Sequence, residues 1–310
     1  MKLLFLGAGA TGGYFGGRLA AAGVDVEFLV RPARAARLRD QPLRIESPLG
    51  NVAVPVKAVI KDALGGADYD LVVLSCKAYG LEDAIASIRP AVGASTYVLP
   101  VLNGLAHLDQ LDAAFGAERT LGGLVQIAAA LAEDGTVRHL NRNHLLVFGP
   151  RLAGQEAFCQ ALLGELSGCG FDVQLSDDIL LEMWEKWVLL ATLAGVTCLM
   201  RAPIGDIVAA PRGEVIIIET LAECAAIATT AGSAPREQTL ARIRGLLTEP
   251  LSSFAASMLR DIEGGKPIEA DHIIGDLIAR ARALRVDTPR LQTTYCHLKT
   301  YENKRARERG

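Results

Sequence analysis

The 310-residue sequence lacks the residue patterns that mark several common kinds of site. Its six cysteines include no CxxC pair, so the sequence predicts neither a zinc site nor a disulfide framework, and we expect reduced thiols. The five histidines show no spacing typical of a metal cluster, and no Ser-His-Asp arrangement is apparent. No Gly-Lys-Ser/Thr ending closes the glycine-rich segment near the N-terminus, which argues against phosphoryl transfer at a P-loop.

A strong charge imbalance and a membrane-spanning run are also missing. The formal net charge of -3 gives no reason to expect nucleic acid or an anionic membrane as a partner. The apolar, uncharged residues 187–200 are fewer than the ~20 that a membrane-spanning helix needs, so we predict a buried helix there. The apolar segment before Gly7 is too short for the core of a signal peptide. We expect a soluble, cytoplasmic protein.

The length and the residue pattern predict two domains. A chain of 310 residues with 50% hydrophobic residues is too long for most single cores and can bury two. We predict an α/β fold, with a Rossmann-type doubly wound sheet domain over residues 1–177 and an all-helical domain over residues 178–310. The strand candidates of the first domain are residues 1–6, 24–30, 51–58, 69–76, 95–99, 122–130, 136–140, 144–148 and 171–175, with helices over 14–22 and 156–167.

The most informative motif follows the first predicted strand. In a strand–turn–helix unit Gly7 permits the tight turn, Gly9 lets the backbone approach a pyrophosphate, and Gly12 allows close packing of the helix on the strand. The N–H groups of the helix N-terminus would face the phosphates. A glycine-rich turn without a ligand is the alternative. We predict that a dinucleotide binds to Gly7, Ala8, Gly9, Ala10, Thr11 and Gly12.

The residue after the second predicted strand bears on the choice of cofactor. Sites selective for NAD usually place Asp or Glu there to bind the ribose 2′-hydroxyl, whereas this chain has Arg31, whose guanidinium suits a 2′-phosphate. NADPH is therefore the predicted cofactor. The alternative is a solvated arginine, because Arg34 and Arg37 make the whole stretch basic.

Several segments together resemble one enzyme family, in its order and over nearly the whole chain. They are the glycine loop, Ser75-Cys76-Lys77-Ala78, Leu102-Asn103-Gly104, Trp184-Glu185-Lys186-Trp187, Ser257-Met258-Leu259-Arg260-Asp261 and Ile268-Glu269-Ala270-Asp271. The sequence resembles the ketopantoate reductase (2-dehydropantoate 2-reductase) family. The resemblance implies an NADPH-dependent oxidoreductase that reduces a 2-oxo acid to a 2-hydroxy acid, ketopantoate to (R)-pantoate in the type reaction of pantothenate biosynthesis. The oligomeric state stays open, with a homodimer as the candidate.

The resemblance also implies roles for individual residues. Lys186 matches the catalytic lysine, which can stabilise and protonate the alkoxide formed when hydride reaches a ketone. Glu269 matches a glutamate that holds a substrate hydroxyl within reach of the lysine, and Ser257 matches a serine that helps to bind the substrate carboxylate. Asn103 and Lys77 follow predicted strands, where ligands bind in an open parallel sheet. The family places Asn103 near nicotinamide and substrate and Lys77 near cofactor or substrate.

Most of these residues have a structural alternative. Lys186 would pair on the helix surface with Glu182, one turn earlier, although the largely apolar sequence that follows favours a site. Glu269 would be an acid in the first turn of a helix that Pro267 opens, and the sequence alone does not decide between the two. The dipeptide Asn103-Gly104 would be a turn.

Three positions depart from the family pattern. Asparagines that commonly line the substrate pocket are replaced by Leu190 and Ala194, one and two helical turns after Lys186, and by Ile204 further on. Three hypotheses follow: a ketopantoate reductase with the change compensated elsewhere, a reductase of the same mechanism for a more apolar 2-oxo acid, or a non-catalytic regulatory protein that binds NADPH. Retention of Lys186 and Glu269 argues against the last, because sensing would not require the acid.

Overall fold

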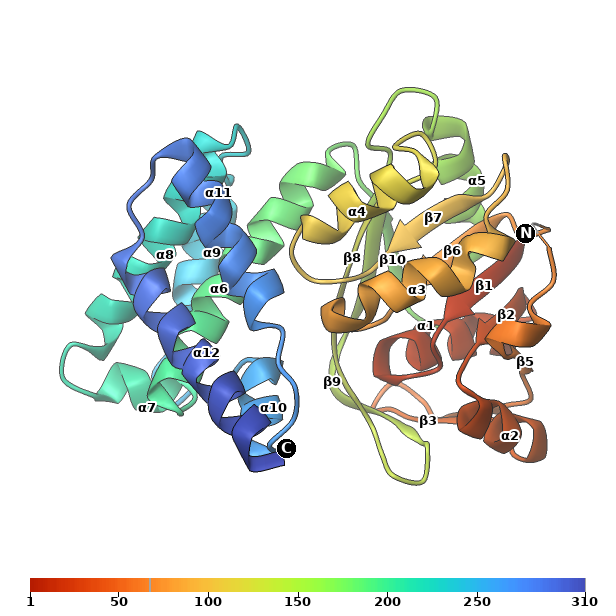
Figure 1. Cartoon of the computed structure of the whole chain (residues 1–310), viewed down its shortest axis with the longest axis horizontal. Coiled ribbons are helices and arrows are strands. Elements are labelled where there is room, and N and C mark those ends of the chain that lie inside the picture. The colour runs from red at the N-terminus through yellow and green to blue at the C-terminus, as the bar shows by residue number, and fades with distance from the viewer. Residues whose placement is uncertain (67, 310) are drawn as a thin grey trace. The chain divides into compact units, whose positions relative to one another are not determined.

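The computed structural model describes residues 1–66 and 68–309, which form two compact units (Figure 1). Unit 1 comprises Met1–Leu102 and His107–Ile179, and unit 2 comprises Asn103–Ala106 and the chain from Leu180 onward. The predicted division after residue 177 lies close to this change of unit. The prediction was wrong for residues 103–106, which cluster with unit 2, because the backbone there is bonded to a histidine that follows in the helical part of the chain.

Unit 1 is built on a five-stranded sheet with the order β5-β2-β1-β6-β7, in which all neighbours are parallel. Its strands are β1 (Lys2–Leu6), β2 (Asp25–Leu29), β5 (Lys57–Val59), β6 (Leu71–Leu74) and β7 (Tyr97–Pro100). Strands β1, β6 and β7 are short, largely apolar runs, as is typical of a parallel sheet that is covered on both faces. The predicted α/β class, with helices flanking a parallel sheet and a helical C-terminal region, is confirmed.

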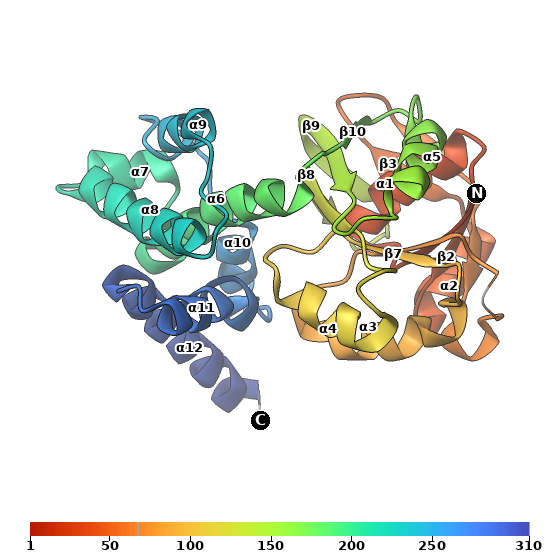
Figure 2. The same ribbon diagram turned by 90° about the horizontal axis from the view of Figure 1, so that it is seen from above.

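The alternation of side chains along β1 explains how the two faces are covered. Leu3 and Phe5 join a core cluster with α1 (Ala10–Ala21) and α5 (Glu156–Leu166), whereas Leu4 joins a second cluster with α3 (Leu81–Ile88) and α4 (Ala106–Phe115). Figures 1 and 2 show α3 and α4 on one side of the sheet and α1 on the other. The helix α2 (Pro32–Asp40) packs against β5.

A second sheet, which the sequence did not predict as separate, covers the α1 side. Its order is β10-β9-β3-β4, and β8 pairs with β9. Its strands are β3 (Leu43–Glu46), β4 (Val52–Val54), β8 (Gly122–Leu131), β9 (Val137–Gly149) and β10 (Asp172–Leu175).

The strand predictions for residues 43–59 and 136–148 differ from the observed strands. The candidates at 136–140 and 144–148 form one strand, because a register shift between Ile127 and Ala129 accommodates the polar residues between them. The candidate at 51–58 divides into β4 and β5 around Pro55, since proline cannot donate to a strand ladder. No strand was predicted where β3 lies.

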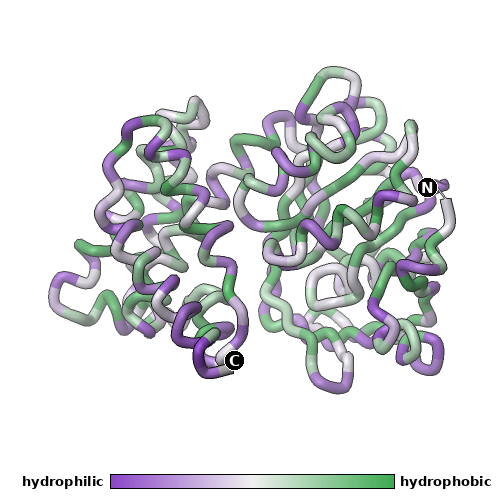
Figure 3. The backbone as a smooth tube through the Cα atoms, viewed as in Figure 1, coloured by the Kyte–Doolittle hydropathy of each residue, from purple (hydrophilic) through white to green (hydrophobic). Residues whose placement is uncertain are grey.

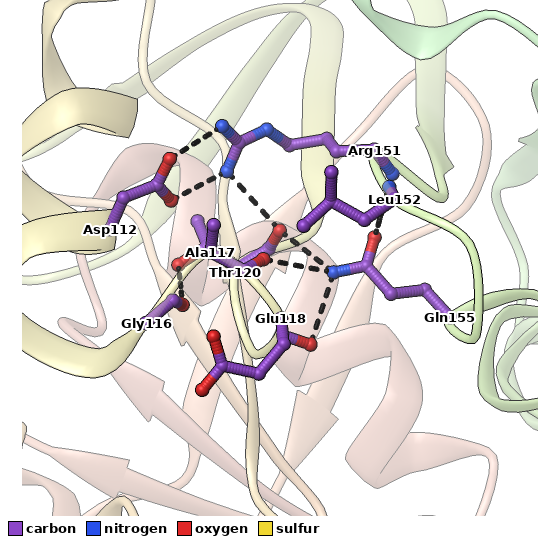
Figure 4. Close-up of polar contacts among 8 residues, drawn as sticks. All are labelled: Asp112, Gly116, Ala117, Glu118, Thr120, Arg151, Leu152 and Gln155. Carbon is purple, nitrogen blue, oxygen red and sulfur yellow. Dashed lines mark hydrogen bonds and ion pairs between the residues drawn. The ribbon is translucent and has the colours of Figure 1, made fainter.

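The half-buried Arg151 and the buried Gln155 fasten the loop that leads into β8 (Figure 4). Arg151 forms a two-pronged ion pair with Asp112 of α4, with both N–O distances 2.7 Å. The Gln155 side-chain amide donates to the backbone carbonyl oxygens of Ala117, Glu118 and Thr120 at 3.1–3.2 Å. These bonds satisfy polar groups that would otherwise be costly to bury.

Unit 2 is helical in its described residues outside the 103–106 segment, apart from the loops. The helix α8 packs against α7, α9, α11 and α12, and the Thr294 hydroxyl of α12 donates to the Gly195 carbonyl of α6 at 3.2 Å. The helix α12 continues to Arg309 and is strongly hydrophilic at that end (Figure 3). The helices are α6 (Ile179–Met200), α7 (Ile204–Ala209), α8 (Gly213–Thr230), α9 (Glu237–Leu247), α10 (Ser257–Glu263), α11 (Asp276–Leu284) and α12 (Pro289–Arg309).

The predicted buried helix at residues 187–200 forms the greater part of α6, and most of its residues have little accessible surface. Among the described residues, no helix combines the length and the apolar character that a membrane span requires.

Candidate active site

The glycine loop of unit 1 has the backbone geometry that its sequence predicts. Gly7 has a φ of 97°, which a side chain would strain, and its N–H donates to the Leu29 carbonyl at 2.9 Å. A Cβ on Gly12 would lie 2.2 Å from the Ser75 hydroxyl oxygen and 2.3 Å from the Gly7 carbonyl oxygen. The packing of α1 at this position therefore requires a glycine. A Cβ on Gly9 would meet nothing within 4 Å. The loop is therefore closely packed at Gly12 and open at Gly9.

The sequence did not single out Ser75 as part of this loop. Its hydroxyl donates to the Leu6 carbonyl at 3.0 Å, just before the glycine turn, and it occupies the space that the missing Cβ of Gly12 leaves. Ser75 therefore helps to fix the loop from the neighbouring strand end. In the sequence, Ser75 was part of a segment that resembles the family, but its contact with the glycine loop was not predicted.

The arginines after β2 differ in their contacts. Arg31 is exposed at the N-terminal boundary of α2. Arg34 is half-buried and donates to the Ala8 carbonyl of the glycine loop at 3.0 Å, and burial together with the nearby Arg37 lowers its pKa below the ordinary value. Arg37 donates to the Glu133 carbonyl at 2.9 Å. Arg34 and Arg37 thus each donate to a backbone carbonyl of unit 1, and both Arg31 and Arg37 are exposed.

Lys77 and Asn103 lie at strand ends, as predicted. Lys77 is exposed and follows β6 of unit 1. Asn103 belongs to unit 2, and its backbone carbonyl lies 2.5 Å from Nε2 of His272. Gly104 has a φ of 74°, and a Cβ there would lie 3.2 Å from the His272 carbonyl oxygen. The segment is therefore a turn that packs on His272, a contact that the sequence did not reveal.

Lys186 lies about two turns after the start of α6, and its side chain is half-buried. Burial lowers the pKa of its amine to about 8, and the Glu269 carboxylate opposes that shift. Glu182, the partner expected for a surface salt bridge, instead lies 3.0 Å from Nη2 of Arg236. The carboxylate that raises the pKa of Lys186 is therefore that of Glu269, which is far away in the sequence, and not that of Glu182, one turn earlier.

Glu269 is half-buried and immediately precedes a helix. Its carbonyl accepts from the Ile273 N–H at 3.0 Å, and a π-helical turn over Asp271–Gly275 then leads into α11. The helix begins at Ala270 and not at Pro267, and Glu269 lies at its N-terminal boundary, where the helix dipole also favours a carboxylate. The Trp187 indole N–H donates to the Ile273 carbonyl at 3.0 Å. This bond joins the Lys186 turn of α6 to the turn that follows Glu269.

Ser257 is the exposed first residue of α10, and the preceding Ala256 N–H lies 3.4 Å from the Thr197 hydroxyl of α6. Of the residues that replace family asparagines, Leu190 is half-buried on α6, whereas Ala194 is 3% exposed and Ile204 is completely buried. Lys186, Leu190 and Ala194 share one face of a continuous helix. Only Leu190 of the three replacements keeps appreciable accessible surface.

The chemistry available at this site is that of an amine and a carboxylate. No group of three or more His, Cys, Asp or Glu side chains within residues 1–66 and 68–309 could hold a metal ion. An amine with a pKa of about 8 is mostly protonated at neutral pH and yet is a better proton donor than an ordinary lysine. Unit 2 thus holds an amine whose pKa is lowered by burial and raised by the Glu269 carboxylate.

Comparison with known proteins identifies related chains along nearly the full length. Two family models match, "Ketopantoate reductase PanE/ApbA" over residues 3–152 and "Ketopantoate reductase PanE/ApbA C terminal" over residues 178–302. An uncharacterized oxidoreductase of Bacillus subtilis, YkpB, is 36% identical, with 97% of this chain and 99% of that protein covered. A 2-dehydropantoate 2-reductase of Pyrococcus horikoshii is 28% identical, with 93% of each chain covered.

Solved structures show the same fold. A ketopantoate reductase of the PanE/ApbA family from Ralstonia eutropha is 27% identical, with a TM-score of 0.88 over 99% of this chain and 100% of that one. A D-mandelate dehydrogenase, solved with NADH and anilino(oxo)acetate, has the same TM-score of 0.88 at 22% identity, over 99% of this chain and 100% of that one, and is therefore alike in fold. On the family-model matches and these relatives, the chain belongs to the ketopantoate reductase family of oxidoreductases.

Proposed function

We propose that this protein reduces a 2-oxo acid to a 2-hydroxy acid with NADPH, with unit 1 holding the cofactor and unit 2 supplying the proton and the substrate contacts. The observation that carries the proposal is the pair Lys186 and Glu269, in which a buried amine with its pKa lowered to about 8 has a carboxylate as its electrostatic partner. Family membership supports the same reaction class.

The glycine loop fits a dinucleotide. The helix α1 begins at Ala10 without a side-chain cap, so its first N–H groups are available to an anion. The space beside Gly9 is open, which leaves room for a pyrophosphate to approach the backbone. Gly7, Ala8, Gly9, Ala10, Thr11 and Gly12 would hold the phosphates, with Lys77 and Asn103 as further contacts. The bound nicotinamide would supply the hydride.

Arg31 supports the choice of NADPH. It is an exposed arginine that follows β2, where the adenosine ribose of a Rossmann-bound cofactor lies, whereas the guanidinium groups of Arg34 and Arg37 each donate to a backbone carbonyl. A guanidinium there would form charge-assisted hydrogen bonds with a 2′-phosphate. NADH, which lacks that phosphate, would gain nothing from Arg31.

On this proposal Lys186 acts at the substrate carbonyl oxygen. As hydride reaches the carbonyl carbon, negative charge develops on the oxygen, and the ammonium group stabilises that charge and then donates its proton. Glu269 favours the charged form of the lysine, which burial alone disfavours, and its carboxylate can accept a hydrogen bond from a substrate hydroxyl. Ser257 would contribute to binding of the substrate carboxylate.

The substrate itself has two candidates. Ketopantoate, which would place the protein in pantothenate biosynthesis, is the first. The second is a 2-oxo acid with an unsubstituted aliphatic body, favoured by the partly accessible Leu190 one turn from Lys186, where the family commonly has an asparagine. An apolar pocket rejects a substrate that adds a hydroxyl by only about 10²-fold, so this replacement would disfavour ketopantoate by about that factor.

The test is NADPH oxidation by the purified protein with a panel of ketopantoate, 2-oxoisovalerate and the aromatic 2-oxo acid phenylglyoxylate. Reduction of at least one of them with kcat/KM in the ordinary range for enzymes, about 10⁴ M⁻¹s⁻¹ or more, would support the proposal. Tight binding of NADPH without reduction of any 2-oxo acid would favour the third hypothesis, a regulatory protein. A homodimer also stays a prediction, which light scattering of the same sample would test.

A further inference from the structure

The acidic residues on the Lys186 turn of α6 are both bound by one arginine from another helix. Arg236 lies at the N-terminal boundary of α9, and its Nη2 contacts a carboxylate oxygen of Glu182 and one of Glu185. Its Nε donates to Oε1 of Glu185 at 2.9 Å, and its backbone N–H donates to the same oxygen at 2.8 Å. Glu185 is only 4% exposed, so these bonds satisfy a buried carboxylate.

From this arrangement we propose that Arg236 is a positioning residue for Lys186, which holds Glu182 and Glu185 so that neither carboxylate pairs with the catalytic amine. The inference rests on the proposed function of Lys186 as the proton donor. Arg236 itself touches neither reacting atom nor substrate in this scheme. It acts through the two glutamates.

The sequence shows why such a device is needed. A glutamate four residues before a lysine is the favoured orientation for an ion pair on a helix, and Glu182 and Lys186 have that spacing. An opposite charge within about 4–6 Å raises the pKa of a lysine by roughly 1 to 3 units. Pairing with Glu182 would therefore make Lys186 an ordinary, weakly acidic lysine. With Arg236 present, the carboxylate acting on the amine is that of Glu269.

The charges around Lys186 agree with this division. Burial alone would raise the pKa of Glu185, but hydrogen bonds from the Arg236 side chain and backbone outweigh it and hold that pKa below its ordinary value. On the α11 side, the Arg280 guanidinium lies 5.9 Å from the Trp184 ring and 5.6 Å from the Trp187 ring, and it pairs with Asp276 at 3.1 Å. Thus Arg280 also has a carboxylate partner of its own.

The experiment compares the pH dependence of kcat/KM in wild type, Arg236→Gln, Arg236→Lys and the triple change Glu182→Gln/Glu185→Gln/Arg236→Gln. We expect wild-type activity to fall above pH 8, because the amine must carry its proton. In Arg236→Gln the alkaline limb should move up by about one pH unit or more, with a lower plateau. Arg236→Lys should keep the alkaline limb of the wild-type pH profile, because the lysine can still bind the two glutamates. The triple variant should keep it as well, because residues 182 and 185 then carry no carboxylate that could pair with Lys186. Arg242→Gln, an exposed position on α9, is the matched control.

A folded Arg236→Gln variant with the wild-type limb would overturn the proposal and leave Arg236 as a structural residue. If that variant does not fold, the pH profile of the single variant Glu182→Gln tests the proposal. Its limb should stay in place if Arg236 already withholds Glu182, and a downward shift would show that Glu182 acts on Lys186 in the wild type.

A second readout does not depend on catalysis. NMR titration of ¹⁵N-labelled lysine side chains, with Lys186 assigned by its loss in Lys186→Arg, measures the amine directly. An upward shift of the Lys186 titration in Arg236→Gln supports the inference even if no 2-oxo acid is reduced, and an unmoved titration overturns it. Failure of the proposed function and failure of this inference therefore give different results.

Discussion

The glycine loop of unit 1 and the Lys186 turn of unit 2 differ in what makes them suited to a ligand. At the loop, side chains are absent where they would collide, since a Cβ on Gly12 would lie 2.2 Å from the Ser75 hydroxyl oxygen. At the Lys186 turn, charged side chains are present and partly or fully buried, and their partners come from elsewhere in unit 2. The first region depends on backbone shape and the second on electrostatics. Substitutions at the Lys186 turn should therefore change mainly catalysis, whereas substitutions in the glycine loop should change mainly cofactor binding or stability.

The largest effect is expected at the electrostatic region. Lys186→Ala should reduce kcat by on the order of 10²-fold or more while the dissociation constant for NADPH stays nearly unchanged, because the variant loses both alkoxide stabilisation and the proton donor. Steady-state kinetics and cofactor titration measure the two quantities. Lys61→Ala, at an exposed lysine of unit 1, is the control. Turnover within a few-fold of wild type would return Lys186 to a structural role.

A matched pair of alanine substitutions tests the backbone region. Gly9→Ala places a methyl group in open space, so stability should be unchanged while NADPH binding weakens more than about tenfold, because the pyrophosphate can no longer approach. Gly12→Ala forces an overlap with Ser75 and Gly7, and should lower the free energy of unfolding by about 1 to 3 kcal/mol. Thermal unfolding without cofactor and a binding titration separate the two. Equal behaviour of the variants would contradict the distinction between the open and the packed side of the loop.

A charge at the edge of the backbone region gives a smaller effect. Arg31→Ala should erode the preference for NADPH over NADH by roughly 1 to 3 kcal/mol, the cost of a lost hydrogen bond to a charged group. The dissociation constants of both cofactors are measured for wild type, Arg31→Ala and the exposed control Arg39→Ala on the same helix. Equal affinity of the wild-type protein for NADPH and NADH would refute the assignment.

The smallest effect is expected at Leu190, where the two candidate substrates separate. Wild type should show kcat/KM for 2-oxoisovalerate at least comparable to that for ketopantoate, because each buried methylene contributes about 0.8 kcal/mol of hydrophobic stabilisation. Leu190→Asn should shift the ratio toward ketopantoate, whereas the exposed control Leu180→Asn on the same helix should not. A several-hundredfold preference of wild type for ketopantoate would show that other residues replace the missing amides.

Features that depend on residues close in the sequence were predicted better than features that depend on contacts between distant residues. The glycine turn follows from neighbouring residues, and the structure confirms its geometry at Gly7, whereas the tight packing at Gly12 also involves Ser75 from another strand end. The continuous strand β9 was missed, because its polar centre has the pattern of a turn, whereas pairing with β8 on both sides of a register shift continues the strand through it. The placement of residues 103–106 with unit 2 was also missed, since it depends on a contact with His272. The assigned roles of Lys186, Glu269, Ser257, Asn103, Lys77 and Arg31 stay predictions.

What the sequence by itself determined is the parallel sheet, the glycine loop and the long apolar helix α6, because side-chain period and local backbone sterics act between residues close in the chain. Only the tertiary structure decided which charges meet. Glu182 had Lys186 within one helical turn, yet Arg236, from another helix, is its partner. A local pair on a solvated helix contributes only about 0.2 to 0.5 kcal/mol, whereas a buried carboxylate such as Glu185 requires a hydrogen-bonded counterion, so the buried group determines where the arginine lies.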